Sequence, residues 1–82
     1  MISTVRDLQP GDLLIGTVSG KQRFDSRVVA LEDVQPGHQV TGPRGGRYAL
    51  TQAGAQELVV VVLGNGRRPL LKKISQVTMH RS

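Results

Sequence analysis

The chain has 82 residues and a formal charge of +5, from eleven Lys and Arg against six Asp and Glu, and it contains no Cys. This length predicts a single domain over residues 1–82 with a small core. The absence of Cys excludes a disulfide scaffold, a thiolate metal site and a Cys nucleophile, and it favours a reducing, cytoplasmic setting. Neither a signal peptide nor an apolar run long enough to cross a bilayer is evident, so we expect no membrane partner.

Two Asp-x-Gln-Pro-Gly segments, at 7–11 and 33–37, predict two tight turns that each lead into a strand. Pro fixes φ at the second position of a β-turn, and Gly accepts positive φ at the third. The repeat indicates either a duplicated half or two hairpins that met the same turn requirement independently.

Runs of β-branched and aliphatic residues between polar, Gly-rich stretches predict the strands of the first half. A lead-in over 1–6 is expected to pair as an edge strand. Four strands should follow it, at 13–18, 24–33, 38–41 and 47–50. Gly16 lies inside the first of these four and indicates a β-bulge or a close backbone approach.

The second half is organised around 58–63, which has the strongest strand signal in the chain. Its apolar residues do not alternate with polar ones, so both faces of this strand should be covered. Before it, 51–57 predicts a single helical or 3₁₀ turn. After it, the Asn-Gly pair at 65–66 predicts a two-residue type I′ hairpin, and 69–79 predicts a last strand or pair of strands.

About five to six short strands with Gly-rich turns and almost no helix predict an all-β fold, a small antiparallel barrel. The Pro-Gly-Asp at 10–12, the Gly-Lys at 20–21 and the Val-Val-Ala-Leu at 28–31 resemble the opening of SH3-like barrels, most closely the KOW-type module of ribosomal proteins and transcription elongation factors. The resemblance covers about residues 8–31 and implies an SH3-like barrel rather than any one activity. The compact, Gly-punctuated style is also similar to small accessory proteins of actinobacterial bacteriophages.

The spacing of the polar residues reveals no catalytic or metal-binding constellation. His38 and His80 do not form a His-x-x-x-His or His-x-His motif, and no Ser lies in a Gly-x-Ser-x-Gly elbow. The Gly-rich segment 42–47 lacks the Lys-Ser/Thr pair of a Walker loop and predicts a plain hairpin loop. We therefore expect no enzyme activity, no metal and no cofactor.

Basic side chains gather in the predicted loops and toward the C-terminus, where no acidic residue follows Glu57. If loops converge at one end of a barrel, about five phosphate contacts would give a log-log salt slope of about −4 to −5 on duplex DNA. Phe24 and Tyr48 are the only aromatic residues, so contacts with nucleic acid should be electrostatic, with little sequence specificity. The alternative is a solvated basic surface. The candidate nucleic-acid-binding residues are Arg44, Arg47, Arg67, Arg68, Lys72 and Lys73.

A second hypothesis is a protein-protein interaction or assembly module. Its interface candidates are Leu58, Val60, Val62 and Leu70, because they supply more apolar strand surface than one thin barrel hides. This hypothesis predicts a homo-oligomer or a protein partner, such as a host or virion protein if the chain is encoded by a bacteriophage. The charge favours nucleic acid slightly over a protein partner.

Overall fold

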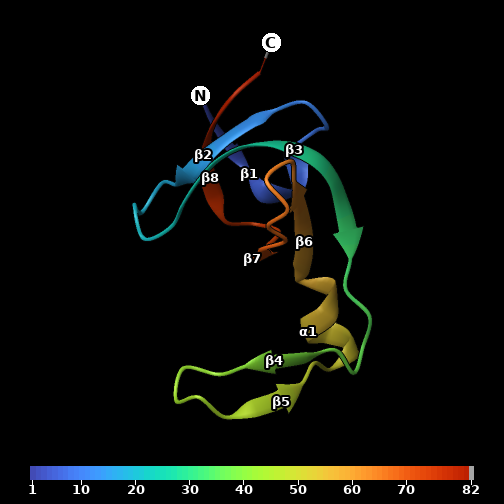
Figure 1. The fold of residues 1–82 in the computed structure, drawn as a ribbon. Coiled ribbons are helices and arrows are strands. Elements are labelled where there is room, and N and C mark those ends of the chain that lie inside the picture. The colour runs from blue at the N-terminus through green and yellow to red at the C-terminus, as the bar shows by residue number, and fades with distance from the viewer. Residues whose placement is uncertain (82) are drawn as a thin grey trace.

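The computed structural model describes residues 1–81 and is all-β, as the sequence predicts, apart from one 3₁₀ turn and one short helix (Figure 1). The elements in chain order are β1 (Ile2–Thr4), η1 (Val5–Asp7), β2 (Leu13–Thr17), β3 (Arg23–Asp33), β4 (Gln39–Thr41), β5 (Arg47–Ala49), α1 (Gln52–Gln56), β6 (Leu58–Leu63), β7 (Leu70–Lys72) and β8 (Gln76–His80).

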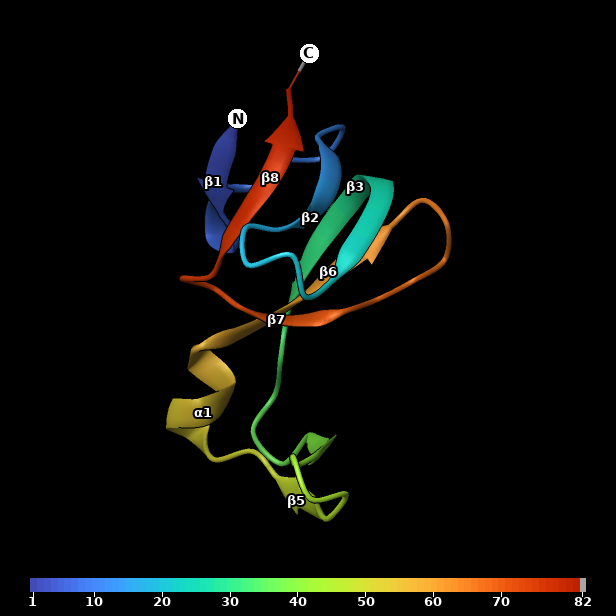
Figure 2. The same ribbon diagram turned by 90° about the vertical axis from the view of Figure 1, so that its left-hand side faces the viewer.

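Six strands form one antiparallel sheet in the order β1-β8-β2-β3-β6-β7. β3 belongs to both halves of this sheet: its first residues pair with β2 and its later ones with β6. A register shift between Val28 and Ala30 marks a bulge, which bends β3 so that the two halves fold around a shared core (Figure 2). This main core consists of Val5, Leu8, Leu14, Phe24, Val28, Val59, Val61, Leu63, Leu71, Val77 and Met79.

The sheet does not close into a barrel, and this part of the prediction is wrong. β1 and β7 are the two edges of the sheet. The chain turns into η1 directly after β1, and residues 73–75 leave the extended conformation after β7, so the two edges cannot form a ladder. Two backbone hydrogen bonds bridge them instead: Val5 N–H donates to Ser75 O at 2.9 Å and Arg6 N–H donates to Lys73 O at 3.0 Å.

Both Pro-Gly turns form where the sequence predicts them. The N–H of Asp12 donates to Gln9 O at 3.1 Å, and that of His38 donates to Gln35 O at 3.2 Å. The glycines at 11 and 37 have φ values of +94° and +89°, which an L side chain would resist. The first turn leads into β2 and the second into β4.

The Asn-Gly pair forms a different turn from the predicted type I′ hairpin. The N–H of Gly66 donates to Leu63 O at 3.0 Å, so Gly64 and Asn65 are the central residues of this turn. Type I′ needs positive φ at both central positions, and neither Gly64 nor Asn65 has it; in this turn only Gly66, the residue after them, has a positive φ, of +88°. The side-chain oxygen of Asn65 accepts a hydrogen bond from Arg67 N–H at 2.9 Å.

β6 is covered on both faces, as its apolar run predicts, but unequally: Val59, Val61 and Leu63 are buried, whereas Leu58, Val60 and Val62 on the other face are half-buried. One face contributes to the main core, and the other packs on a second cluster on the far side of the sheet. This second cluster consists of Val34, Leu50 and Ala55, with Val40, Leu58, Val60 and Leu70 packed against it.

α1 confirms the helical turn predicted at 51–57. Thr51 caps its N-terminus, because its hydroxyl oxygen accepts a hydrogen bond from Gly54 N–H at 3.1 Å, and Ala55 is buried in the second cluster. Within residues 1–81 no helix is long and apolar enough to cross a membrane.

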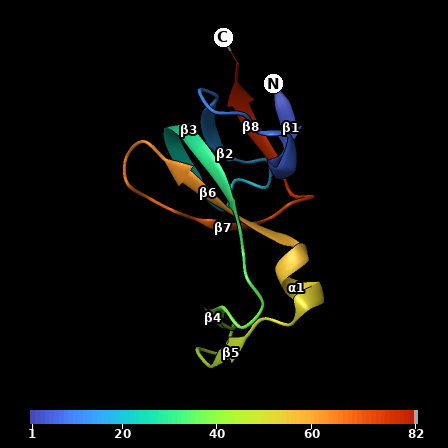
Figure 3. The ribbon, with the colours of Figure 1, turned by 90° about the vertical axis from the view of Figure 1, so that its right-hand side faces the viewer.

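β4 and β5 form a separate two-stranded hairpin, which lies apart from the main sheet in all three views (Figures 1 to 3). We call residues 37–50 the hairpin arm. Its base is closed by Gly37 N–H, which donates to Leu50 O at 2.8 Å, and by Leu50 N–H, which donates to His38 O at 2.9 Å. Because an isolated hairpin is marginally stable in water, the packing of Val40 and Leu50 in the second cluster holds the arm in place.

Candidate nucleic-acid interface

Ion pairs within the chain occupy half of its acidic residues. Asp12 pairs with Arg81, Asp25 with Arg23 and Glu32 with Arg68. Taking these three pairs from the eleven basic and six acidic residues leaves eight basic and three acidic side chains without an ion-pair partner in residues 1–81. The net charge therefore resides on unpaired cations.

The most buried of these pairs is structural rather than a binding site. Asp12 is only 3% exposed, and its two carboxylate oxygens accept hydrogen bonds from Arg81 at 3.0 and 2.9 Å. The hydrogen bond from Arg81 lowers the pKa of Asp12, burial opposes this, and the backbone N–H of Gln9 lowers the pKa further. The pair therefore links Arg81, which follows β8, to the first Pro-Gly turn.

Arg67 and Arg68, both predicted to bind nucleic acid, contact other parts of the chain. Arg67 donates to the backbone oxygen of Arg23 at 3.2 Å, and its guanidinium carbon lies 5.2 Å from the centroid of the buried Phe24 ring. Arg68 pairs with Glu32 on β3. These contacts give both side chains a structural role on the β6–β7 loop.

Arg44 and Arg47 lie on the hairpin arm and are both exposed. The N–H of Gly45 donates to Gly42 O at 3.0 Å, so Pro43 and Arg44 occupy the tip of the arm. In the described part of the chain, neither arginine has an ion-pair partner or a side-chain hydrogen bond. No acidic residue lies between positions 33 and 57, so the arm carries positive charge alone.

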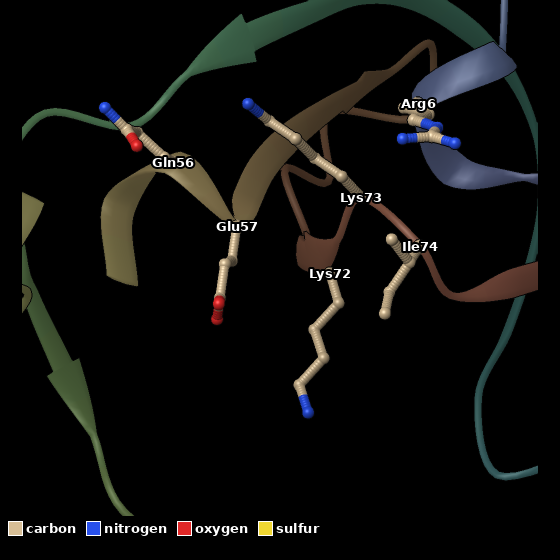
Figure 4. A pocket seen from close by; sticks show the side chains of 6 residues that line it. All are labelled: Arg6, Gln56, Glu57, Lys72, Lys73 and Ile74. Atoms are coloured by element: carbon tan, nitrogen blue, oxygen red, sulfur yellow. The ribbon is translucent and has the colours of Figure 1, made fainter. Parts of the chain in front are cut away.

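Lys72 and Lys73 line a cleft of about 320 Å³ together with Arg6 (Figure 4). Two backbone hydrogen bonds hold the residues of this cleft together. The N–H of Arg6 donates to Lys73 O, and the N–H of Lys73 donates to Glu57 O at 2.9 Å. Adjacent residues in a strand point to opposite faces, but β7 ends at Lys72, and both lysines line the cleft. Figure 4 shows their amino groups pointing in different directions.

The six predicted basic residues thus occupy three places rather than one patch. The hairpin arm lies at one end of the molecule, whereas the β6–β7 loop lies beside the main sheet, away from the arm, in all three views (Figures 1 to 3). Sequence reasoning missed Arg6, because its position beside Lys73 depends on a contact between segments that are far apart in the chain. Its basic side chain in an expected edge strand was the only signal.

The four predicted interface residues, Leu58, Val60, Val62 and Leu70, are half-buried by the chain itself. Leu58, Val60 and Leu70 pack against the second cluster, to which Ala55 of α1 and Leu50 of the hairpin arm belong. Val62 does not belong to this cluster. The sequence predicted an exposed apolar face because residues 34–57, which cover part of it, are mostly polar, and nothing in their sequence indicates that they pack against β6.

Residues 1–81 contain no group of three or more His, Asp or Glu side chains arranged to hold a metal ion, and His38 and His80 are exposed. No protein-family model, curated protein or solved structure matches this chain. Only its own residues therefore bear on its function.

Proposed function

We propose that this protein is a non-enzymatic, cytoplasmic binding module that contacts nucleic acid mainly by electrostatic attraction, with little sequence specificity. Arg44 and Arg47 on the hairpin arm, and Lys72 and Lys73 in the cleft, supply the cations. The resemblance of residues 8–31 to SH3-like barrels remains part of this proposal, and the strongly bent antiparallel sheet supports it.

The main observation in favour of this proposal is that these two arginines and two lysines have no ion-pair partner within residues 1–81. Arg23, Arg68 and Arg81, in contrast, each pair with a carboxylate. A cation that is already paired gains little from a phosphate, since it must give up its carboxylate. An unpaired cation can neutralise a phosphate and release a counterion, which is the main source of non-specific affinity for nucleic acid.

Fluorescence anisotropy with labelled oligonucleotides, single-stranded and duplex, at several salt concentrations tests the proposal. Four phosphate contacts should give a log-log salt slope of about −3 to −4, and each pair of contacts that is removed should reduce the slope by about 2. We expect this reduction for Lys72→Ala with Lys73→Ala, and for Arg44→Ala with Arg47→Ala.

The matched control is Arg23→Ala with Arg68→Ala, which removes the same charge from side chains that are paired within the chain. This double variant should leave the slope nearly unchanged. If all three double variants weaken binding equally, net charge alone is responsible. If the wild-type protein binds neither oligonucleotide at low salt, the proposal is wrong.

An assembly or protein-binding module, whether the partner is a second copy or a host or virion protein of a bacteriophage system, is the second candidate. The observation that favours it is the outer edge of β1, where Met1 and Ile2 are 66% and 60% exposed and no strand pairs. An unpaired strand edge can accept a strand from another chain. Sedimentation of the purified protein tests this second candidate. A stable oligomer that does not bind nucleic acid would support an assembly module.

A further inference from the structure

The basic cleft adjoins a second cleft, which is lined in part by the hairpin arm. The first cleft is lined by Arg6, Lys72, Lys73 and Ile74, and the second, of about 310 Å³, is lined by Tyr48 and residues of α1 and β6. Glu57 and Lys72 line both clefts, so the two meet there. We call the combined surface the trough.

Tyr48 is a suitable stacking residue at one end of the trough. It lies in β5 directly opposite Val40, whose packing against the second cluster places this face of the arm toward the body of the protein. Its ring lies close to Gly42, where an added Cβ would be 3.4 Å from the ring carbon Cε1. The residue is nevertheless 53% exposed, so part of the ring remains open to a ligand.

The rest of the trough combines cations with apolar surface. Arg6, Lys72 and Lys73 have no ion-pair partner in residues 1–81, and Ile74 beside them is 70% exposed. Phosphates and bases alternate along a single strand, so a binding site for one needs positive charge beside aromatic or apolar surface. A duplex hides its base faces and would leave Tyr48 and Ile74 unused.

We propose that the trough binds single-stranded nucleic acid, with a base stacked on Tyr48 and the phosphates beside Lys72, Lys73 and Arg6. This inference rests on the proposed function and adds to it the form of the nucleic acid and the path of the strand. Sequence alone disfavoured stacking because two aromatic residues are few. One exposed ring shares its cleft with Lys72, and Arg6 and Lys73 lie in the adjoining cleft, so the trough has a single stacking position and its phosphate contacts supply most of the affinity.

Tyr48 makes the test direct, because the chain has one Tyr and no Trp and its intrinsic fluorescence comes from this residue. The probe is an oligodeoxythymidylate of about 12 nucleotides, within the usual site size of one small β-domain. We expect saturable quenching of the Tyr48 emission at low salt. The same labelled oligonucleotide, followed by anisotropy, should bind more tightly than a duplex of equal length.

Variants then separate stacking from charge. Tyr48→Ala should weaken binding of the oligonucleotide by about 5- to 100-fold, the usual effect of one lost stacking contact, whereas Tyr48→Phe should retain it. Tyr48→Leu keeps an apolar side chain against the arm but has no aromatic face, so it should behave like Tyr48→Ala. Ile2→Ala, an exposed apolar side chain on β1, is the control and should have no effect.

Glu57 provides a test of opposite sign. It is the acidic residue where the two clefts meet, and it should repel a phosphate held by Lys72. Glu57→Gln should therefore strengthen binding by about 2- to 5-fold, as expected for removing a like charge at short range in water. Asp33→Asn makes the same change of charge at the end of β3, on a side chain that has no ion-pair partner in residues 1–81, and it should have a smaller effect.

The outcomes distinguish this inference from the proposed function. If the duplex binds more tightly than the oligonucleotide, or if binding leaves the Tyr48 emission unchanged and Tyr48→Ala binds normally, the trough is the wrong site although the protein binds nucleic acid. If neither probe binds at low salt, the proposed function itself fails.

Discussion

At the scale of single residues, the ion pair between Asp12 and Arg81 makes the protein sensitive to acid. The folded-state pKa of Asp12 is lowered, chiefly by the hydrogen bond from Arg81. A lowered pKa stabilises the fold at pH values above the ordinary pKa of Asp, about 3.9, and this stabilisation is lost as the pH falls through the folded-state value. Asp12→Asn should therefore lower the free energy of unfolding at neutral pH by about 1 to 2 kcal/mol.

Urea unfolding at several pH values checks this prediction. The difference between the wild type and Asp12→Asn should shrink as the solution becomes more acidic, because the wild-type carboxylate is then protonated as well. Asp25→Asn is the control, since Asp25 pairs with Arg23 on the exposed surface and such pairs contribute little. A constant difference at all pH values would show that the variant acts through something other than this charge.

Gly16 is a position where the backbone approach predicted from the sequence can be tested. It lies at a register shift in β2, and an added Cβ would be 2.6 Å from Gln22 O, closer than van der Waals contact permits. Gly16→Ala should therefore displace the β2–β3 loop and lower the free energy of unfolding by about 1 to 3 kcal/mol. Gly46→Ala is the control, because nothing lies within 4 Å of its added Cβ, and its effect should be within about 0.5 kcal/mol. Chemical denaturation of both variants decides the matter.

At the scale of elements, the hairpin arm depends on the second cluster for its position. Leu50 is 8% exposed and packs there beside Val34 and Ala55. Leu50→Ala removes about 2 to 5 kcal/mol of packing energy at this point, while the main core remains intact. Amide hydrogen exchange should therefore accelerate across residues 37–50 and stay slow in β2, β3 and β8. Equal loss of protection in the main sheet would show that the arm and the sheet unfold as one unit.

The elements themselves could be read from the sequence because their signals are local. Apolar runs such as 58–63 predict strands by composition, and the Pro-Gly pairs fix turns through the φ values of two residues. The Asn-Gly turn was predicted wrongly because Gly64 precedes this pair and the turn begins one residue earlier than expected. A turn centred on Gly64-Asn65 and one centred on Asn65-Gly66 are both compatible with the local backbone preferences, so the sequence alone cannot decide between them.

At the scale of the whole molecule, the sequence could not place the candidate site. Arg6 and Lys73 meet across most of the length of the chain, and Tyr48 reaches the same trough only because the hairpin arm folds back on β6. The acidic partners of Arg68 and Arg81 lie 36 and 69 residues away in the chain, so these paired cations look like unpaired ones in the sequence. The net charge could be read from the sequence, but which cations are paired and where the unpaired ones lie could be seen only in the structure.

The fold also leads to a prediction about association. The edge strand β7 is only three residues long, ends in Lys72 and is flanked by Pro69 and Lys73, and all three of these residues discourage pairing with another chain. The apolar face predicted as an interface is half-buried, because most of it packs against the second cluster. We therefore expect a monomer at micromolar concentrations in analytical ultracentrifugation. A dimer would point to the edge of β1, where Ile2 is exposed, and Ile2→Lys should then dissociate it. A dimer that survives this substitution would contradict both the expected monomer and the assignment of that edge.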